Sequence, residues 1–215
     1  MQDISPVTLF IIAANVLISF KGFNDNLFFH KYCFRVGSIQ QGEKIRVLSS
    51  AFLHIDTTHL FVNMLTLYFF ADAVIAFLGV SGFLGVYFGS LILGNILSLY
   101  FHKDEPEYTA VGASGAVVGA LYASILLQPD MMLGLFFIIP LPAYVFGIGY
   151  LLYSIWAMQR GQDNIGHDAH FGGAMGGYFI TIILTPWVLQ AHTLLVVLLL
   201  IPIVLLFVLK KMGKL

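Results

Sequence analysis

Seven apolar runs, each close to the length of a membrane helix, follow one another along this chain. They are bounded by clusters of charged residues and by glycine or proline. About 20 apolar residues cross the hydrocarbon core of a bilayer, with a range of about 17–25, so most of these runs are long enough to span it. The runs cover residues 4–20, 57–78, 81–101, 113–127, 141–158, 169–185 and 188–209.

Composition supports a membrane protein. Hydrophobic residues make up 59% of the 215 residues and charged residues 10%, whereas soluble domains carry roughly 25% charged residues. We therefore predict an all-α fold, a polytopic helix bundle that forms a single transmembrane domain over residues 1–215. The 188–209 run, nearly pure Leu, Val and Ile, predicts a lipid-facing helix added to a six-helix core. The net charge of −1 gives no support to nucleic-acid binding.

A serine between glycines opens the 113–127 run, in the sequence Gly112-Ala113-Ser114-Gly115. Glycine lets another backbone or a substrate come close. The first N–H groups of a helix have no partner inside it and favour negative charge. Ser114 could therefore attack a carbonyl while nearby N–H groups hold the resulting oxyanion. The alternative is that Ser114 only caps the helix, since serine is a preferred cap.

Counting membrane crossings brings three polar residues together. His59, Ser114 and His170 lie near the starts of the second, fourth and sixth runs. Because even-numbered helices enter from the same side, these residues share one face and a similar depth. Asn63 lies four residues after His59 and so on the same helix face. Polar side chains are costly inside a membrane, which makes each of them a functional candidate.

Small residues predict which helices approach closely. Gly115 and Gly119 lie four residues apart, and two interleaved glycine pairs with this spacing follow His170. Such faces let helix backbones come close, so we expect the 113–127 and 169–185 helices to pack and to place His170 beside Ser114. An imidazole within reach of a hydroxyl is the minimum arrangement for nucleophilic catalysis. The glycines after His170 are Gly172, Gly173, Gly176 and Gly177.

Two other classes of function compete with a serine nucleophile. His54, His59, His167 and His170 would lie on one side, and imidazoles can hold a transition metal, but no HExxH is present and Ser114 would have no role. A channel or transporter is disfavoured because the runs lack paired charges. We expect His54 and His167 in loops or at the interface, no metal and no soluble cofactor. Asp72 is an intramembrane carboxylate without an assigned partner.

Together the motifs Gly112-Ala113-Ser114-Gly115, His59-x3-Asn63 and Ala169-His170-x2-Gly173-x3-Gly177 resemble the rhomboid family of intramembrane serine proteases. The resemblance covers about residues 42–185 and implies a six-helix core, with a seventh helix in some members. It also implies that Ser114 is the nucleophile and His170 its general base, and that His59, Asn63 and the Ser114 N–H form the oxyanion hole. The implied substrates are transmembrane proteins cut near the membrane surface. A non-catalytic relative that binds membrane clients is the alternative function.

Some positions depart from the family pattern. Ile45 stands before Arg46 where the loop signature usually has Trp, Ile75 replaces a common glutamate, and Val118 replaces an aromatic found in some members. Asp168 should point away from His170, so we expect glycine packing alone to hold the imidazole. The loop 158–168, with Gly161 and Gly166, is expected to act as a cap, and the 141–158 helix as a gate for a substrate helix.

The sidedness of the charges conflicts with the orientation that the resemblance implies. All ten Lys and Arg residues fall on the side of Ser114. The positive-inside rule makes that side cytoplasmic, whereas the resemblance to bacterial-type rhomboids implies a plasma-membrane protein whose serine faces outward. The sequence says nothing about the oligomeric state.

Overall fold

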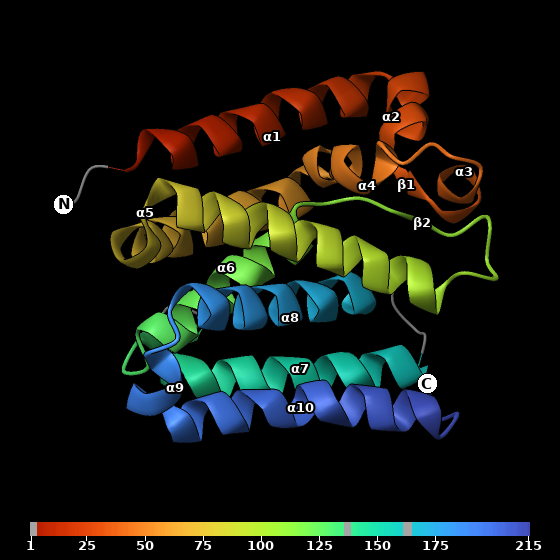
Figure 1. Ribbon diagram of the computed structural model, residues 1–215. Helices are drawn as coiled ribbons and strands as arrows, with labels where there is room; N and C mark the ends of the chain where they lie inside the picture. The colour runs from red at the N-terminus through yellow and green to blue at the C-terminus, as the bar shows by residue number, and fades with distance from the viewer. Residues whose placement is uncertain (1–3, 136–138, 161–164) are drawn as a thin grey trace.

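Most of the chain is helical in the computed structural model, which describes residues 4–135, 139–160 and 165–215 (Figure 1). By length and composition, α1, α5 and α10 can each cross a membrane. The predicted all-α membrane bundle is thereby confirmed. The long helices are α1 (Pro6–Asn24), α5 (Thr57–Phe101), α6 (Ser114–Leu127), α7 (Ala143–Arg160), α8 (His167–Leu184) and α10 (Thr193–Lys211).

Short elements connect the long helices. The loop after α1 contains α2 (Asn26–Tyr32), β1 (Phe34–Arg35), α3 (Val36–Gln40), α4 (Arg46–Ser49) and a 3₁₀ turn, η1 (Ser50–Phe52). β1 pairs in antiparallel fashion with β2 (Thr109–Ala110), which precedes α6. Two further strands, β3 (Met132–Leu135) and β4 (Ile139–Pro142), form a hairpin between α6 and α7. The predicted runs leave most of this hairpin unassigned, and Leu141 and Pro142 lie in β4 and not in the helix that was predicted to begin at residue 141.

The predicted runs 57–78 and 81–101 are the two arms of α5. Gly79 separates them, with φ 68° and ψ 176°. This region of backbone space is open essentially to glycine alone. The chain turns back here, so that α5 contains two helical arms (Figure 1). The predicted 188–209 run is also interrupted, since His192 separates the short helix α9 (Val188–Ala191) from α10.

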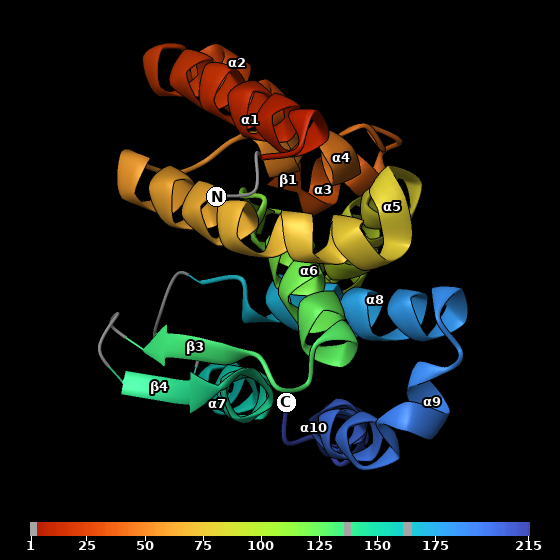
Figure 2. The ribbon, with the colours of Figure 1, turned by 90° about the vertical axis from the view of Figure 1, so that its left-hand side faces the viewer.

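Helix α6 lies at the centre of the molecule, between α5 on one side and α8 on the other (Figure 2). All of its residues from Gly115 to Leu127 are buried. Complete burial explains why this run is shorter than the others, because an enclosed helix need not match the lipid thickness along its own length.

Glycines bring α8 into backbone contact with α6. A Cβ at Gly173 would collide with the carbonyl of Gly115, and a Cβ at Gly177 would collide with the carbonyl of Gly119. The two helices therefore touch through main-chain atoms over two turns, which is the approach expected for small residues four apart.

The opposite edge of α8 packs in the same way on the second arm of α5. A Cβ at Gly172 would lie 2.7 Å from the carbonyl oxygen of Leu93, and a Cβ at Gly94 would lie 2.6 Å from that of Ala169. Both faces of α8 are thus fixed by small residues, and the rotation of α8 about its axis is fixed with them.

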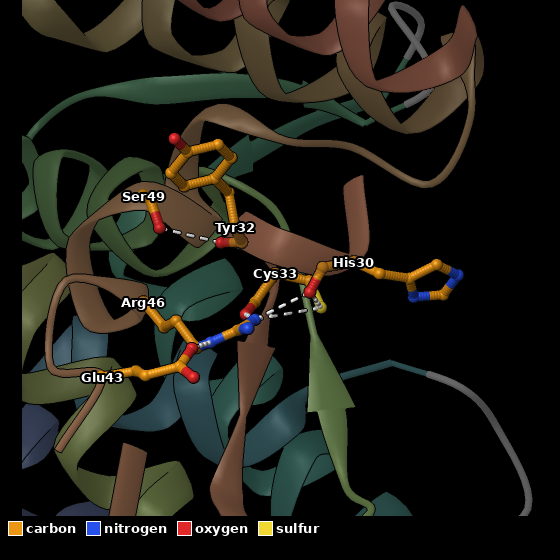
Figure 3. Close-up of polar contacts among 6 residues, drawn as sticks. All are labelled: His30, Tyr32, Cys33, Glu43, Arg46 and Ser49. Atoms are coloured by element: carbon orange, nitrogen blue, oxygen red, sulfur yellow. Dashed lines mark hydrogen bonds and ion pairs between the residues drawn. The ribbon is translucent and has the colours of Figure 1, made fainter. Parts of the chain in front are cut away.

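Arg46 holds the loop between α1 and α5 together (Figure 3). Its guanidinium is buried and donates hydrogen bonds to the carbonyls of His30 and Cys33, at 2.8 and 2.9 Å, and to Glu43 Oε2 at 2.6 Å. Ile45 beside it is 60% exposed. The guanidinium therefore anchors this loop without a tryptophan at the preceding position.

The anchored loop in turn supports the segment before Ser114. The Ser49 hydroxyl donates to the carbonyl of Tyr32 at 2.8 Å, and the N–H of Gly112 donates to the carbonyl of Ser50 at 3.0 Å. The position of the Gly112–Ser114 turn thus depends on a loop residue, Ser50, that lies some 60 residues earlier in the chain.

Asp72, for which the sequence analysis found no partner, caps the N-terminus of α1. Its carboxylate accepts hydrogen bonds from the N–H of Ser5 at 3.2 Å and from the Thr8 hydroxyl at 2.8 Å. Negative charge is favourable at a helix N-terminus, where N–H groups lack partners. The carboxylate therefore joins the first arm of α5 to the start of α1.

We predict that Gly173→Ala destabilises the protein by about 1–3 kcal/mol, because the new methyl group must push α8 away from α6. Gly85→Ala is the matched control: its Cβ would meet nothing within 4 Å, and alanine favours a helix by about 1 kcal/mol over glycine. Unfolding in detergent, followed by circular dichroism, measures both. Equal stability of the two variants would contradict the backbone contact.

Candidate active site

Ser114 and His170 meet where α6 and α8 begin. Ser114 Oγ lies 2.7 Å from His170 Nε2. Ser114 is the first residue of α6, and Ala113 occupies the cap position, where no side chain caps the helix. The serine hydroxyl is therefore directed at the imidazole and not at the helix start, in contrast to the capping alternative.

His59 lies against the turn that carries Ser114. Gly112 has φ 127°, and a Cβ there would stand 2.7 Å from His59 Cε1 and 2.9 Å from Nε2. Both the positive φ and the lack of space call for glycine. Asn63 lies one turn further along the same arm, where its amide donates to the His59 carbonyl at 2.9 Å. His59, Asn63 and Ser114 line one cavity.

His54 lies in the loop between η1 and α5, as expected, where its side chain is buried and links two parts of the chain. Its Nε2 accepts from the Ala113 N–H at 3.5 Å, and its Nδ1 lies 2.8 Å from Ser19 Oγ. The Ser19 hydroxyl donates to the Phe52 carbonyl at 3.0 Å, so Nδ1 of His54 carries the proton. Burial, together with the neighbouring His59, lowers the pKa of His54 to about 3. A neutral imidazole thus ties α1 to the residue before Ser114.

Tyr150 of α7 contacts the second ring nitrogen of His170. Its hydroxyl lies 2.6 Å from Nδ1, and the two ring centroids are 6.1 Å apart with their planes at 28°. The expectation that glycine packing alone holds the imidazole is therefore wrong. Sequence reasoning missed Tyr150 because it looked for an aromatic four residues after Ser114, where Val118 stands, and not on another helix.

Asp168, in the first turn of α8, points away from His170 as expected and faces His102. Its Oδ2 lies 3.4 Å from His102 Nε2, while His102 Nδ1 lies 3.1 Å from Glu105. The ring of His102 also stacks on Tyr108 at 3.5 Å. Burial lowers the pKa of His102, but the two carboxylates outweigh it and raise the pKa above its usual value. This cluster joins the end of α5 to the start of α8.

A cavity of about 1640 Å³ opens beside the Ser114–His170 pair. Its walls come from the first arm of α5, through Thr66 and Phe69, and from α7, through Phe146 and Tyr150. Gly166 of the expected cap also lines it, whereas Gly161 lies outside the described residues. The expected cap loop, Ser114, the first arm of α5 and α7 therefore line the same cavity.

The four histidines considered as metal ligands form two pairs. The rings of His54 and His59 are 4.9 Å apart and those of His167 and His170 are 6.1 Å apart. Within the ranges that the structure describes, no group of three or more His, Cys, Asp or Glu side chains could hold a metal ion. His170 Nε2 faces the serine hydroxyl instead.

The structure is a membrane helix bundle in which a serine and a histidine lie at the N-terminal ends of two helices that pack through glycines. Comparison with known proteins shows which family has this arrangement. The Rhomboid domain model matches residues 41–187. The chain therefore belongs to the rhomboid family.

Individual relatives agree with this assignment. RHOMBOID-like protein 12, mitochondrial, of Arabidopsis thaliana is 30% identical over 77% of this chain and 54% of its own. Rhomboid protein 1, mitochondrial, of Saccharomyces cerevisiae is 33% identical over 62% of this chain and 40% of its own. YdcA of Bacillus subtilis is 32% identical over 66% of this chain and 68% of its own. The chain thus spans about half the length of the two mitochondrial relatives.

We predict that the contribution of His102 to stability depends on pH. Because its pKa is raised on folding, the stabilisation is fully present below the unfolded pKa of about 6.5 and is lost as pH rises through the folded pKa. His102→Gln should therefore lower the melting temperature more at about pH 6 than at about pH 8.5. His30→Gln, at an exposed ring, controls for the loss of an imidazole. A pH-independent difference would contradict the ion-pair cluster.

Proposed function

We propose that the protein is an intramembrane serine endopeptidase that cleaves transmembrane-segment substrates near the membrane surface. The observation that carries this proposal is the 2.7 Å contact between Ser114 Oγ and His170 Nε2 at the wall of a large cavity. A nucleophile hydrogen-bonded to a base, with the base oriented by a third group, is the general signature of covalent catalysis. Membership of the rhomboid family supports the same reaction.

In the proposed reaction, Ser114 Oγ forms a bond to the scissile carbonyl carbon while its proton passes to His170 Nε2. The tetrahedral intermediate collapses as the C–N bond breaks, and the imidazolium returns the proton to the leaving amine. Water then attacks the acyl-enzyme with His170 again as the base, which releases the carboxylic product and restores the serine.

The oxyanion requires hydrogen-bond donors on the side of the carbonyl opposite the base. The Ser114 N–H at the free start of α6, the His59 ring and the Asn63 amide are the proposed donors. The close approach of His59 to Gly112 supports this assignment, since it brings the ring against the turn that carries the serine. No metal or soluble cofactor takes part in this scheme.

Substrates would enter between the first arm of α5 and α7, whose side chains form opposite walls of the cavity. α7 is the proposed gate because side-chain contacts hold it, whereas α6 and α8 touch through their backbones. Two hydrogen bonds connect α7 to its neighbours. The Tyr122 hydroxyl of α6 donates to the Gly147 carbonyl, and the Tyr150 hydroxyl contacts His170 of α8.

The protein is an integral membrane protein, and two membranes compete as its location. The sequence led us to expect a bacterial plasma membrane, whereas the Arabidopsis and yeast relatives are named as mitochondrial. Counting membrane crossings places all ten Lys and Arg residues on the side of Ser114. The positive-inside rule would make that side cytoplasmic, whereas the resemblance to bacterial-type rhomboids favours a serine that faces outward. Fractionation of the source cells and labelling of a cysteine placed at Lys214 decide location and orientation.

We predict that a fluorophosphonate probe labels the wild-type protein in detergent and does not label Ser114→Ala. His170→Ala should also fail to label, because the hydroxyl then lacks a base. No labelling of any form, with wild type still able to capture transmembrane segments in membranes, would favour the alternative, a non-catalytic protein that binds membrane clients.

We predict that His59→Ala and Asn63→Ala each reduce cleavage of a transmembrane substrate about 10²–10³-fold, the usual cost of one oxyanion donor. Tyr68→Phe, at an exposed residue of the same arm outside the cavity lining, is the control and should cleave close to the wild-type rate. Wild-type cleavage by both histidine and asparagine variants would exclude the proposed oxyanion hole.

We predict that a crosslink between α5 and α7 stops cleavage of a transmembrane substrate while a small fluorophosphonate still labels Ser114. Cysteines at Phe69 and Phe146, on opposite walls of the cavity, joined by a bifunctional reagent in a Cys33→Ser background, provide the test. Unchanged cleavage after complete crosslinking means that substrates enter by another route.

A further inference from the structure

His170 lies between two hydroxyl groups from two different helices. Ser114 of α6 contacts Nε2 at 2.7 Å and Tyr150 of α7 contacts Nδ1 at 2.6 Å. The imidazole itself belongs to α8, so three helices meet at one ring. Both ring nitrogens have a partner of known position, and the chemistry of each is therefore constrained.

The assignment of protons follows from the role of the base. A neutral imidazole carries one proton, and Nε2 can accept the serine proton only while the ring proton is on Nδ1. Nδ1–H then donates to the Tyr150 oxygen. Without an acceptor at that position, the tautomer with the proton on Nε2 gains population, and in that form the nitrogen that faces Ser114 cannot act as a base.

We propose that Tyr150 is a positioning residue that selects the active tautomer and the ring orientation of His170, in the place that a carboxylate occupies in serine proteases with a third acidic member. This inference rests on the proposed function. The phenol oxygen is neutral, so it orients the imidazole and, in the active tautomer, accepts from Nδ1–H without adding negative charge beside it.

The surroundings of Tyr150 suit this role, because its ring packs against a neighbour on its own helix. Phe146, one turn earlier on α7, has its ring centroid 5.9 Å away and its plane 13° from parallel, while His170 lies at the hydroxyl end of the Tyr150 ring. The Tyr122 hydroxyl of α6 donates to the Gly147 carbonyl, which ties α7 to α6 close to this stack. The position of the phenol oxygen is therefore defined by packing as well as by its hydrogen bond.

Tyr150→Phe removes only the oxygen and keeps the stacked ring, and it is the decisive variant. The rate of fluorophosphonate labelling at about pH 7.5 should fall about tenfold, the upper end of the value of one hydrogen bond, with the saturation constant for the probe unchanged. Tyr144→Phe is the matched control: it removes a hydroxyl from the same helix at a residue outside the cavity lining, and it should label at the wild-type rate. Labelling of Tyr150→Phe at the wild-type rate overturns the proposal.

A second measurement tests the tautomer without any catalytic turnover. In protein labelled with ¹⁵N-histidine, the His170 signals, assigned with His170→Gln, should show a protonated Nδ1 and an unprotonated Nε2 at about pH 8 in the wild type. In Tyr150→Phe both signals should move toward the values of a mixed population. Unchanged signals would overturn the proposal, even if the variant labels slowly for a structural reason.

The two measurements separate this inference from the proposed function. A wild type that never labels, but whose Nδ1 proton depends on Tyr150, supports the positioning contact and refutes the serine protease. A wild type that labels, with Tyr150→Phe identical in rate and in tautomer, supports the protease and refutes the role of Tyr150.

Discussion

Backbone contact among three helices is the constraint on which the rest of this molecule depends. α8 meets α6 through glycines on one edge and the second arm of α5 through glycines on the other. In a membrane, where apolar side chains gain little by leaving lipid for one another, such contacts are a principal source of helix association. They also fix the distance between the starts of α6 and α8, and hence the distance from Ser114 Oγ to His170 Nε2.

The sequence was sufficient for this framework because each part of it leaves a pattern. Hydropathy marks the helices, the parity of membrane crossings places His59, Ser114 and His170 on one side, and four-residue glycine spacing indicates which helices touch. The 45-residue span of α5 is also consistent with two predicted runs, since Gly79 breaks it. Each of these patterns can be recognised from residues close together in the sequence or from the order of the helices alone.

The contacts that the sequence did not predict all depend on helix rotation or on the course of loops. α7 carries five aromatic residues, and its hydropathy does not indicate which of them faces His170. Asp72 and His102 find their partners on elements far away in the sequence, α1 and the start of α8. The β3–β4 hairpin depends on pairing between two short apolar segments, and such segments read equally well as loop or strand. Side-chain partners of this kind are set by the tertiary structure and leave no pattern in the sequence.

A difference in stiffness follows from the way the helices are held. α6, α8 and the second arm of α5 touch through main-chain atoms that cannot rotate away, whereas α7 is held by side chains, among them Tyr122, which donates to the Gly147 carbonyl, and Tyr150, which contacts His170. Warming should therefore loosen α7 while the three-helix frame is still intact. The ordered position of the His170 imidazole should then be lost some degrees before the helices of the frame unfold, so that ring order and helix content would report two separate thermal transitions.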